Sequence, residues 1–330
     1  MLGEISDFKT LEEIRGQFSK KGTVYWDEVI DTLIRKDILI VKNSNLDKKE
    51  SSLEMWKWNH AARYYHFATR DVKYSFDPVE EKKLFTELAK VEPLPNHYKD
   101  YENHFLKLSS NKETLHTESS ESVSSLLLRR RTIRQFDSKS ISFDQFSRIL
   151  LLTWGKTASV EEGLIERRVI KTSPSGGCRH PIEVYPIVNN VERIPAGIYH
   201  YSVRKHGLEL IRRGSFSNDV TKYCSGQPWF ERAAAIFVMT AILERSMWRY
   251  RNSRTYRIIQ LDAGHLAQTF HLVATALHLG PLTTAGIQDT LLEDALGIDG
   301  INEIAIYVCA VGVPTKDIYE TKPNHLHSYE

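Results

Sequence analysis

The chain has 330 residues, 41% of them hydrophobic, and its 44 lysine and arginine residues nearly balance its 42 aspartate and glutamate residues. A chain of this length and composition can bury one large core and a smaller one. Because the formal net charge is only +2, the composition does not favour binding to nucleic acid or to an anionic membrane. We therefore expect a globular protein that has neither of them as a partner.

The cysteines and the apolar segments narrow the class of protein further. Cys178, Cys224 and Cys309 are odd in number, lie far apart and form no CxxC pair, which argues against a disulfide framework and against a zinc knuckle. No stretch is apolar for long enough to span a membrane, and the first residues lack a signal-peptide pattern. The sequence thus predicts a cytoplasmic protein without a metal site.

Residues 1–50 are predicted to form a small module of two helices and a strand. Apolar periodicity indicates helices from residue 11 and over residues 24–34, and the apolar run at residues 38–41 is typical of a strand. This order resembles a winged helix, but the module has nine basic and ten acidic residues, whereas DNA contact needs a positive excess. Structural packing, and after it docking of a peptide or a protein partner, therefore rank above DNA binding.

Residues 51–106 form a connecting segment that is rich in aromatic side chains. Because large aromatic side chains gain most from burial, we expect this segment to pack onto the main domain. Its aromatic residues include Trp56, Trp58, Tyr64, Tyr65, Phe67, Tyr74 and Phe76. Residues 107–122 are polar and contain no aromatic residue, a composition typical of a linker.

Residues 123–330 are predicted to form the main domain, a mixed α+β fold with a mainly antiparallel sheet flanked by helices. Helical patterns lie near residues 122–132 and 143–154 and in a long segment that ends at 279, whereas strand patterns lie at 182–189, 198–203, 208–213, 234–241, 281–286 and 303–312. The glycine motifs of Rossmann dinucleotide sites and of P-loops are absent from the sequence.

A basic turn follows the first helix of this domain. Arg130, Arg131, Thr132 and Arg134 lie within five residues, just before Phe136. Guanidinium groups and a hydroxyl group at this spacing can surround a phosphate with paired hydrogen bonds. Taken alone, the cluster also fits a solvated basic face.

A second turn, rich in small residues, lies at residues 172–181 and leads into a predicted strand. Its Pro174-Ser175-Gly176 stretch combines fixed backbone angles with small side chains, so that backbone amides can closely approach a flat ligand. Taken alone, it also fits a plain reversal of the chain.

The order of four motifs then resembles the nitroreductase-like FMN enzymes. The motifs are the basic turn, the Pro-Ser-Gly turn followed by Pro181-Ile182-Glu183-Val184-Tyr185, Pro195-Ala196-Gly197-Ile198-Tyr199, and Asp262-Ala263-Gly264-His265. More narrowly, the order is similar to that of the SagB-type dehydrogenase branch, which tailors ribosomal peptides and includes thiazoline and oxazoline oxidases. The resemblance covers residues 122–314.

The resemblance implies an FMN cofactor and assigns residues to it. In the family the basic turn holds the phosphate, which carries over to Arg130, Arg131, Thr132 and Arg134, and the Pro-Ser-Gly turn lies against the flavin ring. The loop that faces flavin N5 carries over to Ala285 and Gly286, and Lys316 is the nearest basic residue for the end of the phosphate site. Pro174, Ser175 and Gly176 would be the ring contacts.

The long helix before residue 279 repeats apolar residues every three or four positions, which predicts a buried stripe. The stripe consists of Ile259, Ala263, Leu266, Phe270, Val273 and Leu277. In the resembling family the matching helix lies at the centre of a dimer, with FMN bound between the subunits. We therefore expect a homodimer with twofold symmetry.

The catalytic pair departs from the family pattern. The azoline oxidases have a Lys-Tyr pair before the long helix, with the lysine as base, whereas this sequence has Arg249-Tyr250, and an arginine side chain stays protonated at any useful pH. Either Tyr250 transfers the proton with help from Arg249, or the chemistry differs from azoline oxidation, or the match is displaced by a residue. A surface arginine beside a packed tyrosine is the structural alternative.

Three functions fit these observations. The first is an FMN-dependent oxidoreductase, a dehydrogenase or oxidase, that tailors a peptide or peptide-like natural product, with hydride passing between a substrate carbon and flavin N5. It implies a peptide or small-molecule substrate and allows a partner enzyme of the same biosynthesis. The second is an NAD(P)H-dependent nitro- or ene-reductase for small molecules. The third is a flavin-binding scaffold subunit without catalysis, which the missing lysine keeps open.

Overall fold

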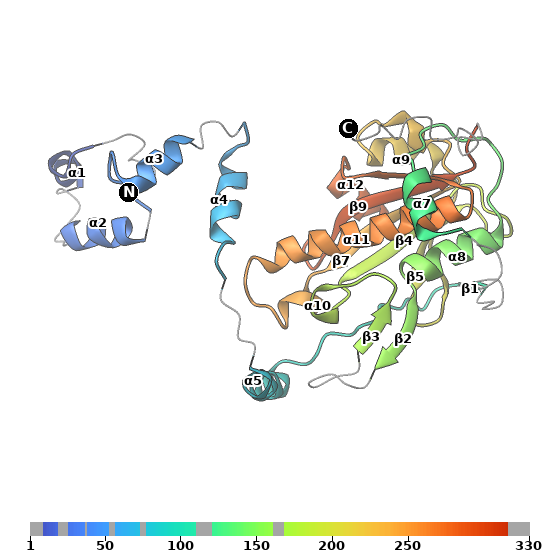
Figure 1. Ribbon diagram of the computed structural model, residues 1–330, viewed down its shortest axis with the longest axis horizontal. Coiled ribbons are helices and arrows are strands. Elements are labelled where there is room, and N and C mark those ends of the chain that lie inside the picture. Colours follow the sequence, from blue (N-terminus) through green and yellow to red (C-terminus); the bar gives the residue numbers. More distant parts are fainter. Residues whose placement is uncertain are drawn as a thin grey trace. The chain divides into compact units, whose positions relative to one another are not determined.

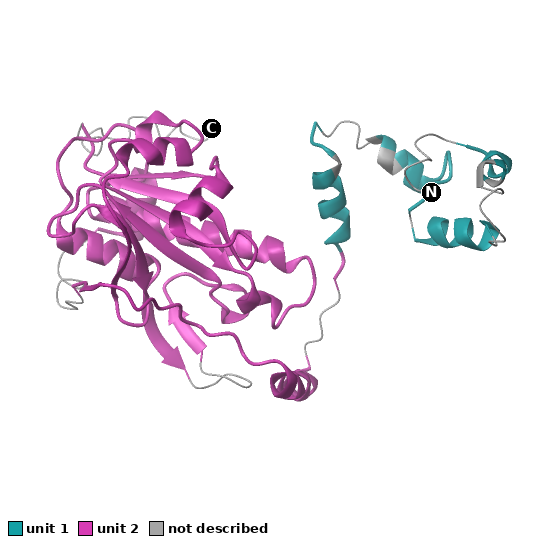
Figure 2. Ribbon diagram, turned by 180° about the vertical axis from the view of Figure 1, so that it is seen from behind, with its two compact units in different colours: residues 1–70 teal, residues 71–330 magenta. Residues whose placement is uncertain are grey.

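The computed structural model of the chain describes residues 9–18, 26–36, 38–52, 57–72, 77–109, 121–160 and 168–315. It divides into two compact units, residues 1–70 and residues 71–330, which Figure 2 shows in different colours. Each unit has its own apolar core.

The described part of the N-terminal unit consists of short helices and turns. The helices are α1 (Leu11–Phe18), α2 (Trp26–Arg35), α3 (Asn45–Ser52) and α4 (His60–Ala68). Ile14 of α1 and Ile30 of α2 belong to one small buried cluster, and Leu39 packs against it. The two helices predicted for this unit are therefore present.

The strand predicted at residues 38–41 is wrong. The backbone N–H groups of Ile38 and Leu39 both donate to the carbonyl oxygen of Leu33, at 2.8 and 3.2 Å, so they close the C-terminal end of α2. The apolar run covers a helix end, and the described part of this unit offers no strand with which it could pair.

The aromatic segment predicted over residues 51–106 is divided between the two units. Within the N-terminal unit, Trp58 and Tyr64 are 67% and 77% exposed, and Phe67 is 44% exposed. Trp56, Tyr74 and Phe76 lie outside the described residues. Residues from 77 onward belong to the main unit and pack on it.

A seven-stranded sheet forms the centre of the main unit (Figure 1). The strands are β1 (Phe105–Lys107), β4 (Ile182–Val188), β5 (Gly197–Ser202), β6 (Gly207–Arg213), β7 (Ala235–Ile242), β8 (Gly280–Thr284) and β9 (Glu303–Gly312). Their order is β1-β6-β5-β4-β7-β9-β8, and every neighbouring pair is antiparallel. A separate small sheet pairs β2 (Lys156–Val160) with β3 (Arg168–Lys171). Lys107, which the sequence assigned to the linker, is the last residue of β1.

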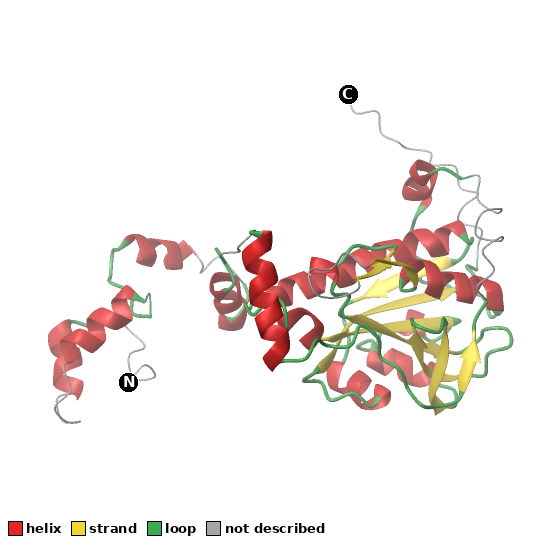
Figure 3. Ribbon diagram, turned by 90° about the horizontal axis from the view of Figure 1, so that it is seen from below, coloured by secondary structure: helices red, strands yellow, loops and turns green. Residues whose placement is uncertain are grey.

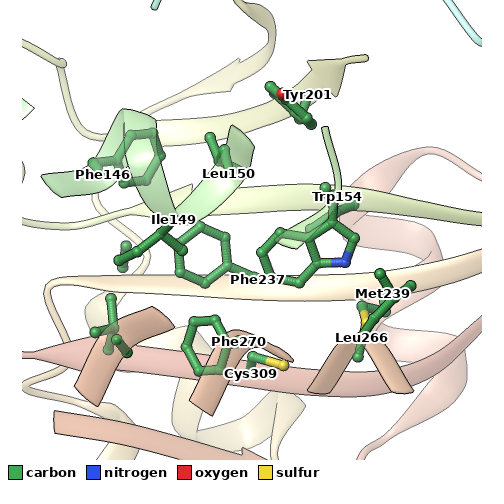
Figure 4. Close-up of a cluster of buried hydrophobic side chains, with 14 of the residues drawn as sticks. Phe146, Ile149, Leu150, Trp154, Tyr201, Phe237, Met239, Leu266, Phe270 and Cys309 are labelled. Atoms are coloured by element: carbon green, nitrogen blue, oxygen red, sulfur yellow. The ribbon is translucent and has the colours of Figure 1, made fainter. Parts of the chain in front are cut away.

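Helices cover both faces of the central sheet, as Figure 3 shows. They are α5 (Pro78–Val91), α7 (Val123–Arg129), α8 (Phe143–Thr153), α9 (Ser217–Tyr223), α10 (Glu244–Met247), α11 (Thr255–Ala276) and α12 (Asp289–Leu296). Side chains of α8 and α11 share one apolar core with the sheet, in which Phe146, Trp154 and Phe270 surround Phe237 (Figure 4). Side chains of α9 and α12 belong to a second core. The predicted α+β fold is confirmed.

The helix α11 positions most of the residues discussed below, and the stripe predicted for it is buried. Ile259, Ala263, Leu266 and Phe270 are at most 7% exposed, and Val273 and Leu277 are partly buried against the same core. Among the described helices, none combines the length and the apolar character that a membrane crossing requires.

The helix α5 is fastened to the segment that follows α10. Asp77 caps its first turn, and Phe85 is buried and stacks on Trp248, with ring centroids 5.9 Å apart. The Trp248 indole N–H donates to the carbonyl oxygen of Glu92 at 3.2 Å. This contact joins the N-terminal end of the main unit to residues just before α11.

A chain of charged side chains crosses three strands of the sheet, and all of its members except Lys205 are buried. His200 of β5 lies between Glu183 of β4 and Glu209 of β6, with each imidazole nitrogen 3.0 Å from a carboxylate oxygen. Arg245 pairs with Glu183 at 2.5 Å, and Lys205 pairs with Glu209 at 2.9 Å. Burial opposes the charge on the imidazole, but the hydrogen bonds to the two carboxylates outweigh it and raise the pKa of His200.

Candidate functional site

A cavity of about 500 Å³ lies beside α11 in the main unit. Its lining comes from the basic turn, from α11 and from the adjacent strands β8 and β9: Arg130, Thr132, Gln260, Ala263, Gly264, Ala267, Gln268, His271, Thr283, Ala285, Ile306 and Tyr307. Its volume lies within the range of about 300–1,000 Å³ that is common for small-molecule and cofactor sites. This cavity is therefore the principal candidate site.

The basic turn reaches the cavity because two apolar side chains anchor it. Ile133 is buried, and its backbone N–H donates to the carbonyl oxygen of Pro281 at 2.9 Å, next to β8. Phe136 is buried beside Gly312 of β9. With the turn held in this way, Arg130 and Thr132 line the cavity.

The two other arginines of the basic turn make different contacts. Arg131 donates to the carbonyl oxygens of Leu128 and Arg130, at 2.9 and 2.8 Å, and so caps the end of α7. Arg134 lies over the ring of Trp229, 5.5 Å from its centroid. Neither lines the cavity, so a role for them in phosphate binding stays a prediction.

The loop after β8 forms another part of the cavity wall. Ala285 lines the cavity, whereas the Gly286 N–H donates to the Thr284 hydroxyl oxygen at 3.0 Å. The Gln227 amide donates both to that hydroxyl oxygen and to the Gly286 carbonyl oxygen, at 3.0 and 2.9 Å. Gln227 thus fixes the loop, although the sequence pattern around it contained no signal of this role.

Three polar side chains from different elements meet at the wall of the cavity. The His271 imidazole of α11 lies 3.3 Å from the Thr283 hydroxyl oxygen of β8, through its Nε2 atom. The Tyr307 hydroxyl group of β9 donates to the same oxygen at 3.2 Å. Burial, and after it the positive charge of Arg130, lower the pKa of His271 to about 4. The imidazole is therefore neutral at physiological pH.

The Pro-Ser-Gly turn is attached to α11 by Asp262. The Ser175 hydroxyl group donates to an Asp262 carboxylate oxygen at 2.6 Å, and the Gly176 N–H donates to the two carboxylate oxygens at 3.2 and 3.3 Å. Burial raises the pKa of Asp262, although these hydrogen bonds oppose the shift. A Cβ atom on Gly176 would lie 2.4 Å from Ile258 Cγ2, so the turn approaches the helix closely.

The predicted catalytic tyrosine lies at the same turn. Gly177 has a φ of 62°, and a Cβ atom there would be 2.2 Å from the Tyr250 hydroxyl oxygen. The structure therefore brings Tyr250 and the Pro-Ser-Gly turn together.

The predicted catalytic arginine faces α5. Its guanidinium group is 3.5 Å from a Glu81 carboxylate oxygen. It also lies over the rings of Phe85 and Tyr250, at 5.0 and 5.4 Å from their centroids. Arg249 thus connects α5 with Tyr250.

Titratable groups also surround a small crevice behind the turn. Lys171 and His180 line it together with Ser175 and Asp262. Burial, with Arg245 adding to it and Glu183 opposing it, lowers the pKa of Lys171 to about 8. The spacing of apolar and polar residues in the sequence did not mark this lysine.

The helix α11 separates the turn from the cavity within one chain. Successive helix residues differ by about 100° around the axis, so Asp262, which holds the turn, and His271, which lines the cavity, lie about 180° apart. Ile258 and Leu266 lie on the side of Asp262, whereas Ala267 lies on the side of His271. Pro174, Ser175 and Gly176 therefore do not line the cavity of their own chain.

The cavity suits an elongated ligand that has an anionic group at one end. The Arg130 guanidinium group and the Thr132 hydroxyl group supply donors at the basic turn. The Nδ1 atom of His271 is buried and has no hydrogen-bond partner among the described residues. Lys316, the other residue predicted to contact a phosphate, lies outside the described residues.

Comparisons with known proteins identify the family. The family model described as "Nitroreductase family" matches residues 127–313, and the chain belongs to this family. A solved structure of a nitroreductase-like protein from Anabaena variabilis is 24% identical and has a TM-score of 0.57, with coverage of 76% of this chain and 47% of that one. This likeness bears out the predicted fold.

Two curated relatives are named as peptide-processing proteins. The trifolitoxin-processing protein TfxB of Rhizobium leguminosarum bv. trifolii is 35% identical over 170 residues, which are 50% of this chain and 46% of TfxB. The microcin B17-processing protein McbC of Escherichia coli is 30% identical over 139 residues, which are 38% of this chain and 48% of McbC. The matched part thus spans about half the length of each relative.

Proposed function

We propose that this protein is an FMN-dependent oxidoreductase that acts in the maturation of a peptide or peptide-like natural product. The observation that carries the proposal is the cavity, where Arg130 and Thr132 at the basic turn and Ala285 at the loop after β8 line one space. These are the residues to which the family resemblance assigns the phosphate and the N5 side of the flavin. The names of TfxB and McbC support a peptide as the substrate.

The residues of the cavity would hold FMN by its tail and by its ring. Arg130 and Thr132 would donate hydrogen bonds to the phosphate, whereas Arg131, Arg134 and Lys316 would add only positive charge around it. Bound FMN supplies a hydride acceptor and donor at N5. The tie between Gln227 and Gly286 keeps the loop that would face N5 in one conformation.

A homodimer would complete the site. Because the Pro174-Ser175-Gly176 turn lies on the far side of α11 from the cavity, it can face an FMN ring only across a subunit interface. The helix offers an exposed stripe for such an interface, with Leu261 62% exposed and with Gly264 and His265 also exposed. A twofold axis at this stripe would place the turn of each copy over the cavity of the other.

Tyr250 is the proposed proton-transferring residue. Its hydroxyl oxygen lies against Gly177, next to the residues that would contact the ring. Arg249 would act through Tyr250, since the contacts of its guanidinium group with Glu81 and Phe85 hold it beside the tyrosine ring. In this role Arg249 supplies a fixed positive charge and position rather than a base.

A partner enzyme of the same biosynthesis and a cytoplasmic location belong to the same proposal. The N-terminal unit has exposed aromatic residues at Trp58 and Tyr64, which suit contact with a peptide or a protein. These expectations rest on the peptide-processing names of the relatives and on the composition of the chain.

Flavin binding is the first test of the proposal. The purified full-length protein should be yellow or should retain added FMN through gel filtration. Protein that stays colourless after incubation with FMN would overturn the proposal. If a peptide precursor is encoded beside the gene, incubation with that peptide should then remove two hydrogen atoms from it, as measured by mass spectrometry.

Two further results would point to the other functions. Rapid anaerobic bleaching of the flavin by NAD(P)H without any peptide would favour a small-molecule reductase. A Tyr250→Phe variant that keeps full activity within a biosynthetic complex would favour a scaffold role. A catalytic Tyr250 instead predicts a large fall in turnover with flavin binding unchanged.

A further inference from the structure

The imidazole of His271 lines the cavity and has one buried polar atom that is without a partner among the described residues. The side chain is 5% exposed, and its Nδ1 atom is buried without a hydrogen-bond partner among the described residues. Leaving a buried polar atom without a partner destabilises the folded protein, and such atoms in folded proteins usually meet a partner. Because His271 lines the cavity, a bound ligand is the natural partner.

The neighbouring hydroxyl groups indicate whether Nδ1 donates or accepts. Tyr307 donates its hydroxyl hydrogen to the Thr283 oxygen. Thr283 has a single hydroxyl hydrogen of its own, and the 3.3 Å contact with Nε2 of His271 is where it can be donated. A neutral imidazole that accepts at Nε2 carries its proton on Nδ1. The contacts from Tyr307 to Thr283 and from Thr283 to His271 therefore favour the tautomer with the proton on Nδ1 of His271, a residue that lines the cavity.

The surroundings of this donor favour an oxygen atom as its acceptor. Arg130 is the charged group that acts on His271 through its positive charge, and it lines the same cavity. A neutral N–H donor beside a guanidinium group suits the phosphate or hydroxyl oxygens of a ligand. If a ligand placed only the apolar edge of a ring beside His271, the donor would have no hydrogen-bond partner.

We propose that His271 is a cofactor-binding residue whose Nδ1–H donates to an oxygen of the ribityl phosphate tail of FMN, with Thr283 and Tyr307 fixing the tautomer. The inference rests on the proposed function, because it takes FMN as the ligand. It extends the phosphate site beyond the basic turn to a residue on α11.

Flavin titrations of three proteins test this role. Apoprotein of the wild type, of His271→Leu and of His271→Asn is titrated with FMN, riboflavin and lumiflavin, and binding is followed by quenching of flavin fluorescence. His271→Leu should bind FMN about tenfold more weakly, since one hydrogen bond to an anionic or hydroxyl oxygen is lost. His271→Asn, whose amide N–H₂ can take the place of Nδ1–H, should recover most of the affinity.

The three ligands separate the outcomes. A loss with FMN alone assigns the donor to the phosphate, a loss with FMN and riboflavin assigns it to the ribityl chain, and both support the proposal. An equal loss with lumiflavin, which has no tail, would show a packing effect and overturn it, as would unchanged FMN binding by His271→Leu. Wild-type protein that binds no flavin would instead reject the proposed function.

A second variant covers the case in which His271→Leu does not fold. Thr283→Val keeps the shape of the side chain but removes the hydroxyl group that sets the tautomer. It should weaken FMN binding severalfold and leave lumiflavin binding unchanged. Equal affinities of Thr283→Val and wild type for FMN would count against the tautomer argument.

Discussion

At the scale of single residues, the Tyr250 hydroxyl group can lie against the turn because Gly177 has no side chain. A Cβ atom at Gly177 would lie 2.2 Å from the Tyr250 hydroxyl oxygen, and the φ of 62° is unfavourable for a side chain. We expect Gly177→Ala to lower the free energy of unfolding by about 2–4 kcal/mol, through backbone strain and overpacking together. Denaturant unfolding measures this loss.

Gly226 is a matched control for the backbone part of this effect. It has a φ of 79°, and a Cβ atom there would meet nothing within 4 Å. Gly226→Ala should therefore cost only about 1 kcal/mol. The double variant Gly177→Ala with Tyr250→Phe lacks the hydroxyl group and should regain part of the free energy of unfolding that Gly177→Ala loses. Equal losses for the two glycine variants would contradict the Tyr250 contact.

The basic turn offers a second comparison between neighbouring residues. Arg130 lines the cavity, whereas Arg131 caps α7 through two carbonyl oxygens. Arg130→Gln should weaken FMN binding by about tenfold or more, because a charged donor to the phosphate is lost, and Arg131→Gln should change it less than threefold. Equilibrium titration with FMN at fixed ionic strength distinguishes the two variants. An equal loss of affinity in both would contradict the separate roles and would mean that Arg131 also binds the phosphate.

At the scale of elements, the order of motifs in the sequence predicted the fold and the groups of candidate residues. It did not predict on which side of α11 each residue lies. One motif supplies Asp262 to the turn and Gly264 to the cavity, and its spacing does not say which face meets which ligand. His271 sits in an apolar helix and has the pattern of a core residue. Its role became visible only when β8 and β9 placed Thr283 and Tyr307 beside it.

The helix α5 shows a second limit of the sequence pattern. Its contacts with Trp248 and Arg249 join residues more than 150 positions apart, and no local periodicity encodes such a contact. The strand predicted at residues 38–41 failed for the opposite reason, because a local apolar pattern cannot say whether a pairing strand exists. Long-range packing decided both cases.

The contact between α5 and Trp248 makes a testable prediction. Phe85 is 7% exposed and stacks on Trp248, whereas its neighbour Leu84 is 63% exposed. Phe85→Ala should lower the stability of the main unit by about 3 kcal/mol and speed hydrogen exchange in α5, and Leu84→Ala should change stability by less than about 0.5 kcal/mol. Hydrogen exchange in α5 that is the same for Phe85→Ala and wild type would show that Phe85 does not fasten the helix.

At the scale of the whole molecule, the buried charges around His200 should make stability depend on pH. The pKa of His200 is raised above its ordinary value of 6.5, so its contribution is complete below about pH 6.5 and is lost as the pH rises through the folded-state pKa. Burial opposes ionisation of Glu183, but Arg245 and His200 lower its pKa from 4.5 to about 2. Its contribution is present above pH 4.5 and is lost as the pH falls toward 2. The network should therefore stabilise the protein most between these limits.

Denaturant unfolding of the full chain at a series of pH values measures this dependence. Above about pH 6.5 the His200 proton should lower the free energy of unfolding with a slope of up to about 1.4 kcal/mol per pH unit. His200→Gln should lose that slope and be less stable at pH 6, because Glu183 and Glu209 lose their shared partner. His104→Gln, at an exposed histidine, should keep it. Buried histidines whose pKa is lowered, such as His271, add a slope of opposite sign in both the wild type and the variants. Should His200→Gln not fold, NMR titration of the His200 imidazole in the wild type decides, since a folded-state pKa at or below 6.5 is incompatible with a protonated His200 between two carboxylates.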